Sequence, residues 1–96
     1  MPPVNVLLVE DEKITLKLVG DMLKELGHQV SLSESAEQGL EAFASNLFDV
    51  VLSDVELPGI DGIEMMRRMR AADPTMAPII MTSRRDQETA VRALEC

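Results

Sequence analysis

The sequence predicts an α/β domain built on a parallel sheet. Short apolar runs alternate four times with stretches in which apolar residues recur every three or four positions. The connections between them are only a few residues long, and this order is typical of parallel strands with helices on both faces. No repeat, low-complexity segment or linker interrupts the pattern, so we expect residues 1–96 to form a single domain.

Residues 4–9 are the first expected strand, which ends on the three acids at 10–12. The helix that follows should span 13–26 and end before Gly27, because glycine commonly terminates helices. The only histidine, His28, follows in a loop, and we expect it at the surface. The expected apolar face of the helix repeats every four residues and comprises Ile14, Leu18, Met22 and Leu26, with Val19 and Leu23 beside them.

Residues 29–32 are expected to form a second, short strand. Ser35 followed by Gln38 three residues later is typical of a capping box, and this pair predicts a helix from 35 to about 46. The expected apolar face of this helix comprises Ala36, Leu40, Phe43 and Leu47.

The third expected strand, at 50–54, begins as an apolar run that fits a strand buried on both faces, and it ends on an acid followed by proline and glycine turn residues. Asp61 should then cap a third helix at 62–72. Three methionines of this helix should fill the core, namely Met65, Met66 and Met69. A fourth strand at 78–81 and a fourth helix from Asp86 onward complete the pattern.

Composition excludes several classes of function. A net charge of -8 argues against binding to nucleic acid or to an anionic membrane. The only aromatic residues are Phe43 and Phe48, so no platform for stacking bases is available. A single cysteine, Cys96, excludes an intrachain disulfide and is compatible with a reducing cytoplasm. No apolar run approaches the ~20 residues that span a bilayer, so we expect a cytoplasmic protein.

Acidic and hydroxyl side chains follow three of the expected strands. Glu10 and Asp11 end the first strand, Asp54 ends the third, and Thr82 follows the fourth. If these strands are neighbours, their ends meet at one edge of the sheet, where each carboxylate pair ~5 Å apart would repel by about 3 kcal/mol. A divalent cation would relieve this repulsion, and ligands that are all oxygen favour Mg²⁺ or Mn²⁺. Asp54 could then act as a nucleophile toward a phosphoryl group.

Three segments occur together in register: Val-Glu-Asp-Glu at 9–12, Asp-Val-Glu-Leu-Pro-Gly-Ile-Asp-Gly at 54–62 and Pro-Ile-Ile-Met-Thr-Ser at 78–83. With them the whole chain resembles the receiver domain of a two-component response regulator. The resemblance implies a flavodoxin-like, doubly wound sheet of strand order 2-1-3-4. It also implies that Asp54 accepts a phosphoryl group from a histidine kinase or a histidine phosphotransfer protein. Such a domain is a phosphoacceptor that assists its own phosphorylation and dephosphorylation, and is not an enzyme.

The resemblance also implies roles for individual residues. Asp11, Asp54 and the backbone carbonyl of Glu56 would hold Mg²⁺, with Glu10 contributing through water. Thr82 would hydrogen-bond the new phosphoryl oxygens and draw the loop after the fourth strand inward. Positioning and charge neutralisation would supply most of the catalysis, as in phosphoryl transfer generally.

Two residues beside the site, Glu56 and Arg84, are expected to modulate the reaction. Each lies two positions after a site residue, and in this family those positions affect how long the phosphoryl group survives. Because one is acidic and the other basic, we hypothesise that they pair across the mouth of the site and hinder attacking water.

The chain departs from the family at its C-terminal end. Receiver domains have a fifth strand that ends on a lysine, and a fifth helix, and none of these is present before Cys96. We therefore expect a receiver domain that is incomplete at its C-terminus. The strand at 78–81 would then be an exposed edge, through which the chain could self-associate.

Two other functions fit parts of the pattern. A haloacid-dehalogenase-like phosphatase also uses an aspartate nucleophile and Mg²⁺, but its nucleophile lies on the first strand and is followed two residues later by a second aspartate, where this chain has Glu56. A receiver-like interaction module that is never phosphorylated would not need Asp11, Asp54 and Thr82 together. Binding of Mg²⁺ and a beryllofluoride phosphoryl mimic distinguishes a signalling receiver from such a module.

Overall fold

The computed structural model describes residues 2–81 and contains one parallel sheet of four strands in the order β2-β1-β3-β4. The strands are β1 (Asn5–Val9), β2 (Gln29–Ser33), β3 (Val50–Asp54) and β4 (Ala77–Met81), and the helices are α1 (Lys13–Glu25), α2 (Ala36–Ser45) and α3 (Gly62–Ala72). The predicted class and strand order are confirmed, and the predicted boundaries of these elements differ by no more than one residue. Thr82, Arg84 and the helix predicted from Asp86 lie outside the described residues.

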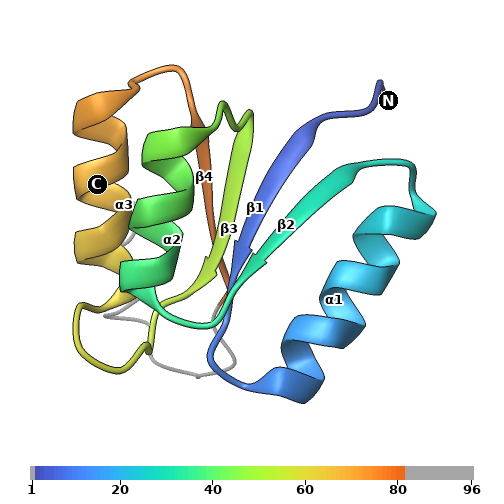
Figure 1. The fold of residues 1–96 in the computed structure, drawn as a ribbon, viewed down its shortest axis with the longest axis horizontal. Coiled ribbons are helices and arrows are strands. Elements are labelled where there is room, and N and C mark those ends of the chain that lie inside the picture. Colours follow the sequence, from blue (N-terminus) through green and yellow to red (C-terminus); the bar gives the residue numbers. More distant parts are fainter. Residues whose placement is uncertain (1, 82–96) are drawn as a thin grey trace.

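The sheet is covered on both faces. Helix α1 lies against one face, and α2 and α3 lie side by side against the other (Figure 1). The main core fills the space between the sheet and α2 and α3, and the three methionines predicted to fill it are each no more than 1% exposed. The core residues that α3 and the strands contribute are Leu7, Val9, Val51, Met65, Met66 and Met69.

Helix α1 buries a different face from the one predicted. The four residues of the expected stripe are exposed, from 55% for Met22 to 79% for Ile14, and the buried residues are Leu16 and Gly20. Gly20 allows the helix to approach the sheet, because a Cβ at this position would lie 3.0 Å from the side chain of Leu32 on β2. The prediction of the helix was therefore confirmed. The prediction of its inward face was wrong for the four-residue stripe, whereas Val19 and Leu23, expected beside that stripe, are half-buried.

The end of α2 also differs from the prediction. Leu47, expected on the apolar face, is 86% exposed, because the helix ends at Ser45 and the chain turns before β3. Phe48 takes its place in the core, where its ring stacks on that of Phe43 with centroids 6.3 Å apart.

Local signals at the helix ends are confirmed. Ser35 Oγ accepts a hydrogen bond from the Gln38 N–H at 3.1 Å, although the Gln38 side chain accepts from the Glu34 N–H rather than from that of Ser35. Asp61 Oδ1 accepts from the Glu64 N–H at 2.8 Å and caps α3. Gly27 follows α1 with a φ of 94°, the left-handed conformation that glycine adopts most readily.

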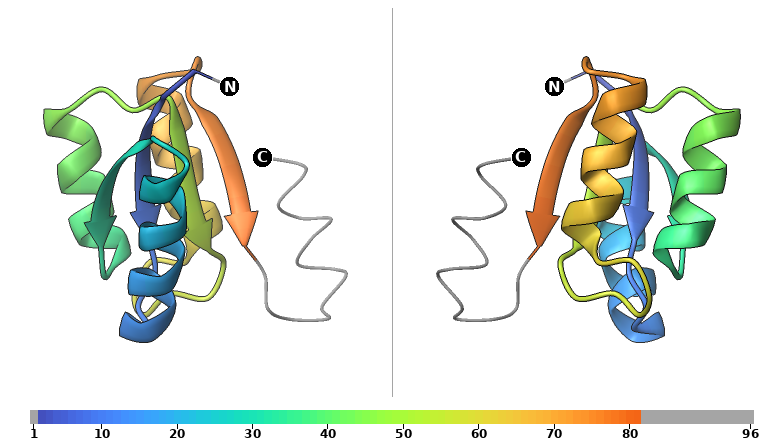
Figure 2. Two further views of the ribbon diagram at one scale, coloured as in Figure 1. Left: turned by 90° about the vertical axis from the view of Figure 1, so that its right-hand side faces the viewer. Right: turned by 90° about the vertical axis from the view of Figure 1, so that its left-hand side faces the viewer.

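Strand β4 lies at an edge of the described sheet (Figure 2). The Ala77 N–H donates to Asp49 O beside β3. The backbone N–H and C=O groups of every second residue of β4 therefore point toward β3, and the backbone groups of Pro78 and Ile80 point toward the open edge. Because proline has no N–H, this edge offers fewer donors to another strand. Self-association through it stays a prediction.

His28 is half-buried and not at the surface as predicted. Its Nδ1 accepts a hydrogen bond from the Val4 N–H at 3.2 Å, which ties the loop after α1 to the start of β1.

Within the described part of the chain, no helix has the length and apolar character needed to cross a membrane.

Candidate metal centre

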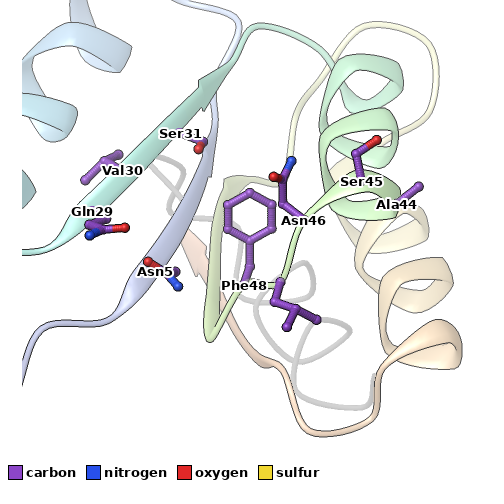
Figure 3. Close-up of a pocket in the computed structure, with 9 residues that line it drawn as sticks. Asn5, Gln29, Val30, Ser31, Ala44, Ser45, Asn46 and Phe48 are labelled. Atoms are coloured by element: carbon purple, nitrogen blue, oxygen red, sulfur yellow. The ribbon is translucent and has the colours of Figure 1, made fainter.

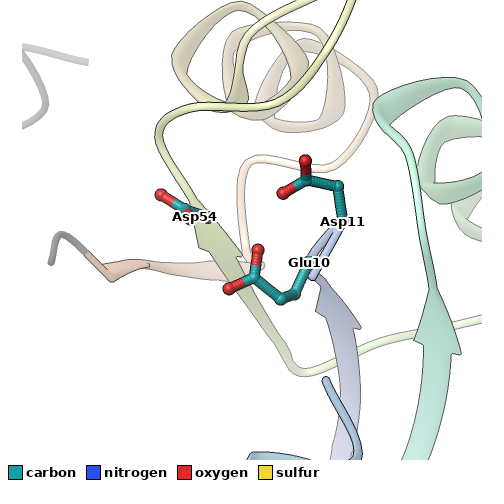
Figure 4. Close-up of side chains that lie close together, drawn as sticks. All are labelled: Glu10, Asp11 and Asp54. Atoms are coloured by element: carbon teal, nitrogen blue, oxygen red, sulfur yellow. The ribbon is translucent and has the colours of Figure 1, made fainter. Parts of the chain in front are cut away.

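The acids at the ends of β1 and β3 meet at one edge of the sheet. The two strands are parallel neighbours that pair Val9 with Ser53, so the residues after this pair leave the sheet side by side. One carboxylate oxygen each of Glu10, Asp11 and Asp54 lies within 4.8 Å of the other two (Figure 4). The structure thus brings together all three carboxylates that the sequence analysis singled out.

Glu10 is the most unusual of the three. Its side chain is 5% exposed, and its Oε2 has no hydrogen-bond partner among the described residues. Burial, and then the negative charge of Asp54, raise the pKa of Glu10 to about 7 from its ordinary value near 4.5. A buried carboxylate oxygen without a hydrogen-bond donor is costly, and a bound cation is one way to compensate it.

The carboxylate of Asp54 is held by a backbone N–H two residues later in the chain. Its Oδ1 accepts a hydrogen bond from the Glu56 N–H at 3.1 Å, which restricts rotation of the carboxylate. Asp54 is half-buried and Asp11 is exposed, so the cluster runs from the interior at Glu10 to solvent at Asp11. Such a site is accessible to a cation and to a second molecule.

The loop after β3 returns the chain to the start of α3 directly beside Asp54. Val55 and Leu57 are buried in this loop, and Gly59 turns it with a φ of 77°. The Gly62 N–H then donates to Val55 O at 2.9 Å. The loop is therefore tied at both ends, which limits movement of Asp54 at the end of β3.

Sequence reasoning missed two residues of this region, Ser53 and Gly62. Ser53 is fully buried and its Oγ donates to the backbone oxygen of Asp54 at 2.8 Å. A Cβ at Gly62 would overlap that same oxygen. The available signals were a serine beside the acid in an apolar strand and a glycine at the first position of a helix, and neither is informative without the geometry.

Of the remaining predicted site residues, Glu56 is exposed in the loop after β3, and Thr82 and Arg84 lie outside residues 2–81. The pairing of Glu56 with Arg84 therefore stays a prediction, as does the contact of Thr82 with a phosphoryl group.

A groove of about 700 Å³ lies at the opposite end of the sheet, between the starts of β1 and β2 and the end of α2 (Figure 3). Its polar lining residues carry amides and hydroxyls, namely Asn5, Gln29, Ser31, Ser45 and Asn46. No ionisable residue lines it, so the acid-base and metal chemistry of the described chain is concentrated at the carboxyl edge of the sheet instead.

Comparison with known proteins agrees with this geometry. The family model described as "Response regulator receiver domain" matches residues 6–96. The chain is 34% identical over 92 residues to the transcriptional regulatory protein ZraR of Escherichia coli (strain K12), and the match covers 96% of this chain and 21% of that protein. The chain thus spans about a fifth of the length of this curated relative.

Solved structures agree as well. A response regulator receiver domain protein from Clostridium thermocellum superposes with a TM-score of 0.90 at 30% identity, over 96% of this chain and 75% of that one. The response regulator TrrA of Thermotoga maritima, solved in complex with Mg²⁺-BeF, gives a TM-score of 0.87 at 27% identity, over 95% and 79% of the two chains. The chain belongs to the receiver domain family of two-component response regulators.

Proposed function

We propose that Asp54 accepts a phosphoryl group from the phosphohistidine of a histidine kinase or a histidine phosphotransfer protein. The observation that carries the proposal is the cluster of Glu10, Asp11 and Asp54, whose ligand atoms lie within 4.8 Å of one another at the carboxyl edge of a parallel sheet. Membership of the receiver family supports a two-component partner as the donor. The proposal places the domain in the cytoplasm, where kinases have access to ATP.

A divalent cation, Mg²⁺ or Mn²⁺, would be held by Asp11, Asp54 and the backbone carbonyl of Glu56, with Glu10 contributing through water. When bound, such a cation neutralises charge on the carboxylates and on the incoming phosphoryl group. The buried Oε2 of Glu10 supports this assignment, because it has no hydrogen-bond partner among the described residues and a bound cation or its water would supply one. The solved Mg²⁺-BeF complex of TrrA adds support from a relative.

The transfer itself needs an oriented carboxylate. An oxygen of Asp54 attacks phosphorus, the phosphorus–nitrogen bond of the donor histidine breaks, and its electron pair stays on the imidazole nitrogen, which takes up a proton. The Glu56 N–H on Oδ1 holds the Asp54 carboxylate in one orientation during the attack. Attack of water on the resulting acyl phosphate returns the carboxylate and inorganic phosphate. The domain is thus a phosphoacceptor that assists its own reactions and not an enzyme.

Signalling, and the lifetime of the acyl phosphate on Asp54, would depend on residues near the carboxyl edge of the sheet. Thr82, which follows β4 in the sequence, would hydrogen-bond the phosphoryl oxygens and draw the loop after β4 inward. Glu56 and Arg84 would pair across the mouth of the site and slow hydrolysis. Replacing both by alanine should then shorten the lifetime of the acyl phosphate, and an unchanged lifetime would remove this part of the proposal.

Binding of beryllofluoride, a phosphoryl mimic, in the presence of Mg²⁺ tests the assignment of Asp54. We expect saturable binding to the wild-type chain by isothermal titration calorimetry and no detectable binding to Asp54→Asn. The matched control is Asp49→Asn, because Asp49 also flanks β3 but lies at its opposite end, where its Oδ2 accepts from the Asn5 N–H and an asparagine oxygen can do the same.

The outcomes separate the possible functions. Binding by wild type and Asp49→Asn but not by Asp54→Asn supports the phosphoacceptor. Absence of binding by the wild-type chain would contradict it and favour an interaction module that is never phosphorylated. Sustained hydrolysis of phosphate monoesters would instead indicate a phosphatase.

A further inference from the structure

The backbone carbonyl of Asp54 is enclosed by two small residues. Ser53, with no exposed surface, donates its Oγ–H to this carbonyl oxygen at 2.8 Å. Gly62, the first residue of α3, is also buried and packs against the same oxygen. The end of β3 and the start of α3 therefore meet at the peptide of the residue whose carboxylate belongs to the metal centre.

Gly62 is required here for space and not for its backbone conformation. Among the described glycines only Gly27 and Gly59 have positive φ, so an alanine at 62 would meet no dihedral penalty. Its Cβ, however, would overlap the Asp54 carbonyl oxygen and lie 3.1 Å from the carbonyl carbon and 3.2 Å from Ser53 Oγ. Two of these three neighbours are backbone atoms, which cannot move aside as the end of a flexible side chain can.

A methyl group at 62 must displace either α3 or the Asp54 peptide. The start of α3 is held by the Gly62 N–H bond to Val55 O at 2.9 Å and by the Asp61 cap. The Asp54 side chain is held through the Glu56 N–H, which belongs to the same loop. A displacement of either partner therefore reorients the Asp54 carboxylate relative to Glu10 and Asp11.

We infer that Gly62, together with Ser53, is a positioning residue that sets the direction of the Asp54 carboxylate through its backbone carbonyl. The inference rests on the proposed function of Asp54. Metal–ligand distances in well-formed sites lie within about 0.2 Å of their usual values, so a small rotation of this carboxylate weakens cation binding. Residues that orient a ligand without touching the metal typically change its affinity about 10- to 100-fold.

Binding of Mn²⁺ alone, followed by electron paramagnetic resonance of the free ion, tests the inference. We expect Gly62→Ala to weaken Mn²⁺ binding about 10-fold or more under conditions in which circular dichroism shows it folded. The control for stability is Gly39→Ala, because Gly39 is a buried helical glycine of α2 whose added Cβ would meet only side chains, the nearest being Val9 Cγ2 at 3.0 Å and Met65 Sδ at 3.2 Å. This control should lose stability but keep the affinity of the wild type.

If Gly62→Ala does not fold, Ser53→Ala carries the test, since it removes the hydrogen bond to the Asp54 carbonyl without adding an overlap. A loss of affinity in Ser53→Ala that is absent in Gly39→Ala supports the inference. Wild-type affinity in the folded Gly62→Ala or Ser53→Ala variant, or an equal loss in Gly39→Ala, overturns it while leaving the proposed function intact. Absence of Mn²⁺ binding by the wild-type chain would overturn both.

Discussion

Glu10 is a carboxylate held at the end of β1 with almost no access to water, and its chemistry follows from that position. Its backbone N–H donates to Ser33 O at 3.0 Å, which keeps the chain in the sheet one residue beyond the strand. The side chain lies close to the acids Asp11 and Asp54, and the hydrogen bond from the Glu12 backbone offsets their effect on its pKa only in part. Burial and like charge together raise its pKa to about 7.

This shift predicts an unusual dependence of stability on pH in metal-free buffer. The folded-state pKa of about 7 lies above the ordinary value of 4.5, so between these pH values the folded chain binds more protons at Glu10 than the unfolded chain does. The contribution of Glu10 to the free energy of unfolding is therefore fully present below about pH 4.5 and is lost as pH rises through 7.

Urea unfolding of the wild type and of Glu10→Gln across this range, with a chelator present, measures the effect. The difference in unfolding free energy between the two proteins should shift in favour of Glu10→Gln as pH rises. A difference that does not change with pH would show that Glu10 titrates normally.

The sequence also predicted the acids of the metal centre, but not the residues that hold Asp54 in place. A single acid after an apolar strand is more often a turn or helix-cap residue, but acids at the ends of two strands that can be neighbours predict a site, and Glu10, Asp11 and Asp54 were found in this way. Ser53 and Gly62 are common residues in ordinary positions. Their importance comes from distances between β3 and α3, which no local pattern in the sequence contains.

Among the elements, α1 shows most clearly what a pattern of apolar residues leaves out. The four-residue repeat correctly predicts a helix, yet the side that packs on the sheet is marked by Leu16 and Gly20. A glycine adds nothing to an apolar pattern, but it permits the closest approach between the helix and Leu32 of β2. In α1 the face that approaches the sheet most closely is therefore not the one with the regular apolar repeat.

Two leucines of α1 provide a direct comparison of its two faces. Leu16 is 7% exposed and Leu18 is 59% exposed. We expect Leu16→Ala to lower the free energy of unfolding by about 2–4 kcal/mol, because it removes buried methyl groups and leaves a cavity. Leu18→Ala should cost less than about 1 kcal/mol. Chemical denaturation of the two variants checks this, and an equal or larger cost at Leu18 would show that the repeat marks the buried face after all.

At the scale of the whole molecule, the order of elements predicted the fold. Four strands alternating with helices and short connections leave little choice besides a parallel sheet covered on both faces, as observed. The alternation alone does not say which strands are neighbours, and the order 2-1-3-4 came from the family resemblance. That order makes β1 and β3 adjacent and so brings Asp54 to Glu10 and Asp11, which lie more than 40 residues earlier in the sequence.

The measurement that tests the account most directly is the free energy of unfolding as a function of Mg²⁺ concentration at neutral pH. If the carboxylates of β1 and β3 share one cation, Mg²⁺ at ten times its dissociation constant should stabilise the wild-type chain by about 1.4 kcal/mol. Asp11→Asn should be more stable than the wild type without Mg²⁺, because one repulsive charge is gone, and should lose most of the response. Wild-type stability that does not change with Mg²⁺, or an undiminished response in Asp11→Asn, would contradict the account.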